Sequence, residues 1–194
     1  MPALDRVLEA SGVRCEAVDV FAAAAGPGSF TGVRIGVCAA KGLAHAVGKP
    51  CAQIDALEAL AKNFFGFEGV VCPILDARRG QVYTARCDAS DGLPKRLCAD
   101  EAVTITALLD ALEDVRRVVF TGDGIDLHAR EIDRRMGARA LIAPPNLRDL
   151  RPEAVCALAR RSPQAWMPPH QLQPIYLRKP QAERERAARL GVHG

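Results

Sequence analysis

The sequence lacks the patterns that mark several common classes of protein. Its seven cysteines are odd in number, and no two of them stand as Cys-x-x-Cys. This spacing argues against a disulfide framework or a zinc site and favours reduced thiols. No uninterrupted apolar run is long enough to span a bilayer. We therefore expect a cytoplasmic protein without membrane segments.

Catalytic and metal-binding signatures are also missing. The four histidines stand singly, and no serine lies in a Gly-x-Ser-x-Gly elbow. The formal net charge is only +3 and the pI is near 8.5, which is too weakly basic to indicate nucleic-acid binding by itself. We expect neither a catalytic residue nor a metal ligand in this chain.

The most informative stretch is Gly-Pro-Gly-Ser-Phe-Thr-Gly-Val-Arg-Ile-Gly at residues 26–36. The apolar run at 18–25 predicts a buried strand before it, and a helix is expected from the loop to about Val47. A glycine loop between a strand and a helix is an arrangement that holds anions. The glycine spacing fits neither the dinucleotide fingerprint nor the P-loop. The candidate nucleotide or anion contacts are Gly28, Ser29, Thr31 and Arg34.

Small residues recur every four positions along this helix, at Gly32, Gly36, Ala40 and Ala44. A face with almost no side chain lets another backbone approach closely. Glycine inside a helix costs about 0.5–1 kcal/mol relative to alanine, so its use there needs a reason. Two interpretations remain open. The face packs against the domain's own sheet, or it contacts a helix of another protein.

A short amphipathic helix is expected at residues 2–11, ahead of this stretch. It places Leu4, Val7 and Leu8 on one face and has Gly12 as its stop. We expect it to pack beside the small-residue helix and to form one surface with it. The alternative is that both helices simply cover the sheet.

The rest of the chain alternates predicted strands and helices, which indicates an α/β fold. Asp55 and Glu58 have the spacing of a capping box. Gly122-Asp123-Gly124 is either a nucleotide contact or a tight turn in which Asp123 or Asp126 caps the next helix. The remaining predictions are a hairpin of 70–75 with 81–87 whose turn needs positive φ at Gly80, a helix at 107–112 capped by Thr106, a strand at 117–121, a helix at 152–160, an extended segment at 163–174 pinned by Trp166, and a basic tail over 178–189.

These motifs, in this order, resemble the TsaB (YeaZ) family. The match rests on residues 26–36 and the helix after them, and it extends through 55–61, 74–83, 122–124 and 174–178. The resemblance implies an actin-like (ASKHA, ribonuclease H-like) α/β fold. It also implies a non-catalytic role in making N6-threonylcarbamoyladenosine at position 37 of ANN-decoding tRNAs.

Two features depart from the family's pattern. Family members begin with strands before the first helix, whereas this sequence begins within that helix. We therefore expect a truncated N-terminal lobe at 1–66, a second α/β lobe at 67–194, and an unpaired edge on the strand at 18–25. The catalytic paralogue, TsaD, carries a His-x-x-x-His metal motif, which this sequence does not contain.

The resemblance also implies partners. A TsaD-like catalytic subunit would bind the helices at 2–11 and 32–47, a TsaE-like ATPase would join the complex, and ATP or ADP would lie near the interface. tRNA would be contacted indirectly, and the isolated chain would be a candidate homodimer. The alternative is a small ATPase or metallopeptidase of the same fold group. The candidate partner-binding residues are Leu4, Val7, Leu8, Gly32, Val33, Gly36, Val37, Ala40 and Ala44.

Overall fold

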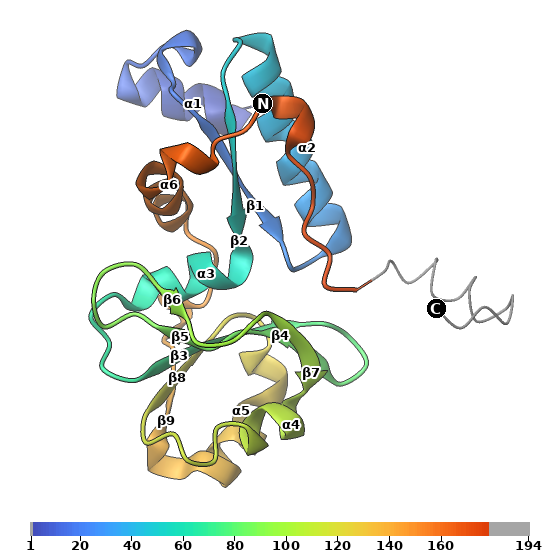
Figure 1. The fold of residues 1–194 in the computed structure, drawn as a ribbon, viewed down its shortest axis with the longest axis vertical. Coiled ribbons are helices and arrows are strands. Elements are labelled where there is room, and N and C mark those ends of the chain that lie inside the picture. Colours follow the sequence, from blue (N-terminus) through green and yellow to red (C-terminus); the bar gives the residue numbers. More distant parts are fainter. Residues whose placement is uncertain (1, 179–194) are drawn as a thin grey trace, which may run out of the picture.

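The structure is a computed structural model that describes residues 2–178, and these residues form helices around two β-sheets (Figure 1). The predicted tail from Lys179 onward lies outside the described residues. Within residues 2–178, no helix combines the length and apolar character needed to cross a membrane.

The first sheet has two parallel strands between two helices. β1 (Phe21–Gly26) pairs with β2 (Cys51–Asp55). Alternate alanines of β1 point to opposite faces, as strand geometry requires. Ala23 and Ala25 pack against α2 (Phe30–Ala46), whereas Ala22 and Ala24 pack against α6 (Pro152–Arg161) (Figure 1). Alanine on both faces lets both helices lie close to the strand.

The second sheet is centred on β3 (Val70–Asp76), which pairs in parallel with β8 (Val118–Thr121). β8 is buried along its whole length because the sheet is covered on both faces. α3 (Ala56–Ala61) covers one face. The other strands of this sheet are β4 (Gln81–Thr84), β5 (Cys87–Asp88), β6 (Lys95–Arg96), β7 (Glu101–Thr104) and β9 (Ala140–Ile142), and the other face is covered by α4 (Ile105–Asp110) and α5 (Ile125–Met136).

Local signals in the sequence explain several element ends. Asp55 Oδ1 accepts a hydrogen bond from the Glu58 amide at 2.9 Å, which confirms the predicted cap of α3. The predicted cap of α4 is wrong. Thr104 Oγ1, rather than Thr106, accepts from the Ala107 amide at 3.2 Å, so the helix begins two residues earlier than expected.

The hairpin between β3 and β4 is confirmed, with one correction at its turn. Gly80 has the expected positive φ of 69°, but Arg78 and Arg79 also have positive φ, at 63° and 58°. Asp76 stabilises this unusual turn because its carboxylate accepts from the Arg78 amide at 2.8 Å.

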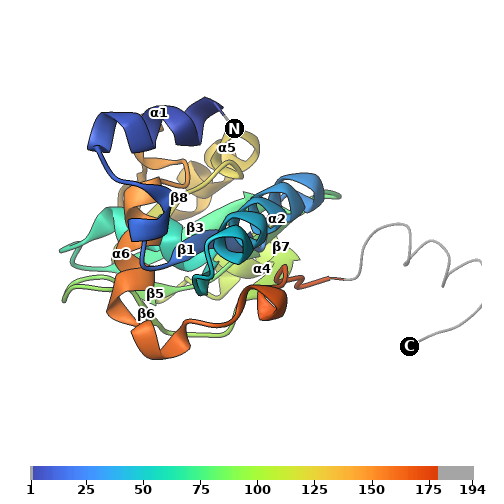
Figure 2. The same ribbon diagram turned by 90° about the horizontal axis from the view of Figure 1, so that it is seen from above.

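The position expected for the first helix is wrong. α1 (Pro2–Ser11) does not pack along α2, and Figure 2 shows the two helices apart. Val7 is 63% exposed, whereas Leu4 and Leu8 are half-buried. An amphipathic pattern predicts that a helix has an apolar face but does not say which neighbour covers that face.

The proline-rich segment after α6 returns along the first sheet. Trp166 Nε1 donates to the Ala159 carbonyl at 2.9 Å, and Leu172 is fully buried beside α2, so the expected anchoring by Trp166 is confirmed. The amide of Ile175 donates to the Ala25 carbonyl of β1 at 2.6 Å. The boundary predicted between residues 66 and 67 stays a prediction, while α6 and this segment lie against the first sheet.

Candidate functional site

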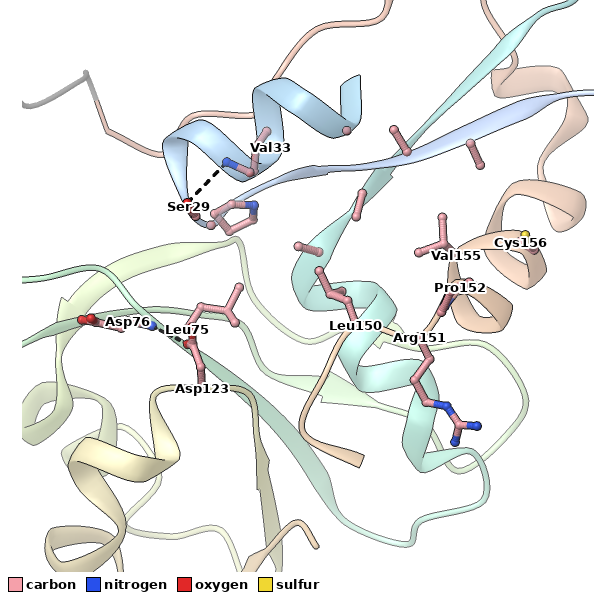
Figure 3. A pocket seen from close by; sticks show the side chains of 18 residues that line it. Ser29, Val33, Leu75, Asp76, Asp123, Leu150, Arg151, Pro152, Val155 and Cys156 are labelled. Carbon is pink, nitrogen blue, oxygen red and sulfur yellow. Dashed lines mark hydrogen bonds between the residues drawn. The ribbon is translucent and has the colours of Figure 1, made fainter. Parts of the chain in front are cut away.

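A cavity of about 550 Å³ lies between the two sheets, where β1 meets the start of α2 (Figure 3). Ala22, Ala23 and Ala24 all line it. Three consecutive residues reach the same cavity because β1 pairs only with β2 among the described strands, so its other edge forms the cavity wall. The start of α6 closes the opposite side through Pro152 and Val155.

The glycine loop contributes only part of the predicted anion site to this cavity. Gly28 and Ser29 line it, whereas Thr31 and Arg34 do not. Ser29 Oγ is the cap of α2 and accepts from the Gly32 amide at 3.4 Å (Figure 3). Its hydroxyl is therefore used by the helix start, and no histidine of residues 2–178 lines the cavity beside it.

Two carboxylates stand across the cavity from the loop, and both hold backbone in place. Asp123 Oδ1 accepts from the Asp76 amide at 2.9 Å (Figure 3). Asp76 Oδ2 pairs with Arg78 at 3.1 Å, and Asp76 Oδ1 accepts from the Arg78 amide. The prediction that Asp123 or Asp126 caps α5 is wrong, because that helix has no side-chain cap. Gly122 has a φ of 104°, and a side chain there would collide with the Ile74 carbonyl, so the turn requires glycine.

Within residues 2–178, no group of three or more histidine, cysteine, aspartate or glutamate side chains is placed to hold a metal ion. The remaining charged group at the cavity, Arg151, is paired with Glu153 at 2.6 Å. The cavity is thus lined mainly by small and apolar residues, including Gly32, Val33 and Gly36 of α2, with a few polar groups already engaged in local contacts.

The small-residue stripe of α2 divides between surface and core. Gly32 and Gly36 are exposed and Val33 is half-buried, but Ala40 and Ala44 are 7% and 0% exposed and pack with Ala23 and Ala25 of β1. Val37 is buried with them. The cause is helical geometry: four residues turn about 400°, so a stripe of spacing four drifts about 40° per step. The drift carries the stripe from the exposed side at Gly32 into the core at Ala44.

The fold itself does not require glycine at position 36. A Cβ added there would meet no atom within 4 Å, and one added at Gly32 would meet only Ser29 atoms at 3.6 Å. This differs from Gly26, where an added side chain would collide with the Ile175 carbonyl. Internal packing therefore does not require the exposed glycines of α2, and both line the open cavity.

An aromatic–arginine cluster lies beside the start of α2. The Arg34 guanidinium lies 3.9 Å from the Phe30 ring centre, and its Nε donates to the Tyr176 hydroxyl at 2.8 Å. The two rings stack with centres 5.5 Å apart. Sequence reasoning selected Arg34 but missed both rings. The four-residue spacing of Phe30 and Arg34 could have suggested their contact, whereas Tyr176 lies 142 positions away.

A second arginine lies in a buried acidic cluster between the sheets. Arg96 pairs with Asp55 at 2.5 Å and with Asp100 at 2.7 Å, and all three side chains are largely covered. Burial raises the pKa of Asp100 to about 7, neighbouring Asp55 and Glu58 act in the same direction, and Arg96 opposes them. Burial also raises the pKa of Glu58. These contacts support the sequence interpretation of Glu58 as structural.

The sequence of this chain is similar to one protein-family model and to several known proteins. A protein-family model described as TsaD, tRNA N6-adenosine threonylcarbamoyltransferase, matches residues 1–128. The chain is 36% identical over 184 residues to the tRNA threonylcarbamoyladenosine biosynthesis protein TsaB of Bacillus subtilis, which covers 94% of this chain and 80% of that protein. A shorter match to TsaB of Haemophilus influenzae is 43% identical over 86 residues and covers 43% of this chain and 36% of that protein.

Among solved structures, YeaZ from Pseudomonas aeruginosa has a TM-score of 0.73 and 25% identity, with 91% of this chain and 81% of that chain covered. This likeness confirms the predicted actin-like α/β fold. The Bacillus subtilis match spans most of both chains, and the solved relative has a similar fold over most of its length. The chain belongs to the TsaB (YeaZ) family of actin-like proteins.

Proposed function

We propose that this chain is a non-catalytic scaffold in the synthesis of N6-threonylcarbamoyladenosine at position 37 of ANN-decoding tRNAs. In this role it binds and activates a TsaD-like catalytic subunit. The observation that carries the proposal is the exposed pair Gly32 and Gly36 in the cavity wall, where they leave a flat strip on α2 that no side chain of the described residues covers. Such a strip lets a partner helix approach closely.

The polar side chains at the cavity make structural contacts, which supports a scaffold over the alternative ATPase or metallopeptidase. In the described part of the chain, the Ser29 hydroxyl caps α2, and Asp76 and Asp123 hold backbone at the β3 end. Neither carboxylate belongs to a group of three or more histidine, cysteine, aspartate or glutamate side chains of the described residues that could hold a metal ion. The chemistry would then belong to the TsaD-like partner.

Other members of the assembly follow from the same proposal. ATP or ADP would bind where the cavity meets the partner, near Gly28 and Ser29, and a TsaE-like ATPase would act on the assembled complex. tRNA would be held by the other subunits. Without a partner, the flat strip of α2 would be free for pairing with a second copy of this chain.

The proposal is tested by substituting Gly36 with leucine and titrating the purified chain with the TsaD-like subunit. We expect loss of measurable binding, because the added side chain keeps the partner helix away. The variant should stay folded, since the position faces open space. Ala40 is unsuitable for this test because it is buried, and leucine there would overpack the core.

Gly42 supplies the matched control. It is also a helical glycine of α2 with no atom within 4 Å of an added Cβ, and it lies about 240° around the helix from Gly36. Gly42→Leu should bind the TsaD-like subunit with wild-type affinity. Normal binding by a folded Gly36→Leu variant would place the interface elsewhere.

A further inference from the structure

A second cavity lies at the opposite end of α2 from the glycine loop. Its volume is about 410 Å³, and it shares no lining residue with the cavity between the sheets. The end of α2 and the residues that lead into β2 form one side, and residues 166–169 of the proline-rich segment form the other. The role proposed for the glycine strip leaves this cavity unused.

The side of the cavity opposite α2 is apolar and fixed in place. Trp166 Nε1 donates to the Ala159 carbonyl at 2.9 Å, and Met167 exchanges two backbone hydrogen bonds with Cys51, each of 2.8 Å. Two prolines complete this wall, and their rings restrict the backbone further. An apolar wall that is already ordered suits the body of a small ligand, because binding then requires little additional ordering of the protein.

The side formed by α2 contributes basic side chains. His45 and Lys49 line the cavity, whereas no aspartate or glutamate does. Within residues 2–178, neither the His45 ring nor the Lys49 ammonium makes a hydrogen bond or an ion pair. Lys41 differs, because its ammonium donates to the His170 carbonyl at 3.5 Å. Lys49 is therefore a cation beside an apolar wall with its hydrogen-bonding capacity unused in the described part of the chain.

The end of α2 does not cancel this positive charge. The last carbonyls of a helix carry partial negative charge. Here the Lys49 amide donates to the Ala44 carbonyl at 2.9 Å, and the Gly48 amide donates to the His45 carbonyl at 3.4 Å. Gly48 has the positive φ, 67°, that this kind of helix end favours. Both carbonyls are thus satisfied by the chain itself, and the side chains of His45 and Lys49 set the polarity of the cavity.

We propose that this cavity binds a small carboxylic acid, with the carboxylate on Lys49 and His45 and the apolar body against Trp166 and Met167. Charge complementarity carries the choice, since the lining has two basic side chains and no acidic one. Two donors match one carboxylate, whereas a phosphate backbone requires several cations in a row. The volume falls in the range of about 300–1,000 Å³ that is usual for small-molecule sites. The inference goes beyond the proposed function and does not rest on it.

The test compares 4-phenylbutyrate with its neutral amide, 4-phenylbutyramide, which has the same apolar body without the charge. Trp166 is the only tryptophan of the chain, so its fluorescence reports binding at this cavity. We expect both probes to change the emission of Trp166 saturably. The Kd of the acid should be on the order of 1 mM, which is ordinary for a probe of this size, and that of the amide about fivefold weaker.

Variants of the basic side chains locate the carboxylate. Lys49→Gln should bind the acid and the amide equally, while Lys49→Arg keeps the charge and should keep the preference for the acid. His45→Gln should weaken the acid about twofold. Lys62→Gln is the matched control, because Lys62 does not line the cavity and its ammonium lies 4.8 Å from the centre of the Phe65 ring. This control should keep the fivefold preference. Circular dichroism verifies that each variant is folded.

Each contrary outcome identifies a different error. Equal binding of the acid and the amide by the wild-type chain would overturn the inference in favour of a purely apolar cavity. Emission that neither probe changes saturably would overturn it outright. A preference for the acid that survives in Lys49→Gln, or that Lys62→Gln loses to the same extent, would overturn it in favour of another site or of bulk charge. None of these results bears on the TsaD-like subunit, whose binding is tested separately at Gly36.

Discussion

Two arginines of this chain are used in opposite ways. Arg96 is covered, and both ends of its guanidinium are paired with carboxylates of the same chain. Arg34 is exposed, rests on two neutral aromatic groups, and keeps its terminal nitrogens without a described partner. Within residues 2–178, the fold uses both ends of the first guanidinium for ion pairs and only the Nε of the second for a hydrogen bond.

The largest change in stability is expected from replacing Arg96. Arg96→Met removes the cation that neutralises Asp55, Asp100 and Glu58, so buried carboxylates are left without a counter-charge. We expect a loss of about 3–5 kcal/mol in the free energy of unfolding at pH 8. Urea denaturation measures it. A loss below that of an average surface substitution would mean that the cluster is solvated in solution.

A smaller effect concerns the pH dependence of the same cluster. The pKa of Asp100 in the folded chain is about 7, above its ordinary value of 3.8. An acid whose pKa rises on folding stabilises the fold most below its unfolded pKa, and this stabilisation is lost as the pH rises through 7. The free energy of unfolding should therefore fall between pH 5 and pH 8.

Asp100→Asn isolates this titration, because the amide cannot ionise. The variant should flatten the decline, which runs from pH 5 to about pH 7. Two pH units at roughly 1.4 kcal/mol per unit give an upper bound of about 3 kcal/mol, and solvent screening of the partly exposed group reduces the expected difference to about 1–2 kcal/mol. Denaturation curves at several pH values give the slope directly. An unchanged slope in Asp100→Asn would assign the titration to another group.

The smallest effect on stability is expected at the second arginine. Arg34→Met loses an exposed aromatic contact and one hydrogen bond, so the free energy of unfolding should change by no more than about 1 kcal/mol. Tyr176→Phe keeps the ring stack and removes only the hydroxyl, and it should cost about half as much. If Arg34→Met destabilised the chain as strongly as Arg96→Met, the contrast between the two arginines would be false.

The sequence predicted local structure better than it predicted contacts. The cap at Asp55, the hairpin at Gly80 and the anchor at Trp166 depend on neighbouring residues, and the structure confirms them. One partner of each arginine lies far along the chain, Tyr176 for Arg34 and Asp55 for Arg96, and no spacing rule brings these pairs together. Caps, turns and local anchors depend on a few residues that are close in the sequence. The contacts with Tyr176 and Asp55 depend instead on how the sheets are arranged.

Helix α2 shows the same limit of sequence-based prediction. Its four-residue stripe was visible in the sequence, and two interpretations of it were open. The first applies to Ala40 and Ala44, which pack against the chain's own sheet. Gly32 and Gly36 are exposed in the cavity wall, and for them contact with another protein stays a prediction. A drift of about 40° per four residues separates the two parts of the stripe, and only the position of β1 shows where the change occurs.

The central claim is that the exposed strip of α2 serves a catalytic partner, and reconstituted tRNA modification tests it most directly. The assay combines the TsaD-like subunit, the TsaE-like ATPase, ATP, a threonylcarbamoyl donor and an ANN-decoding tRNA, with and without this chain. We predict that N6-threonylcarbamoyladenosine forms only when the chain is present, that Gly42→Leu supports it, and that folded Gly36→Leu does not. Modification at the full rate without the chain, or with Gly36→Leu in its place, would contradict the account.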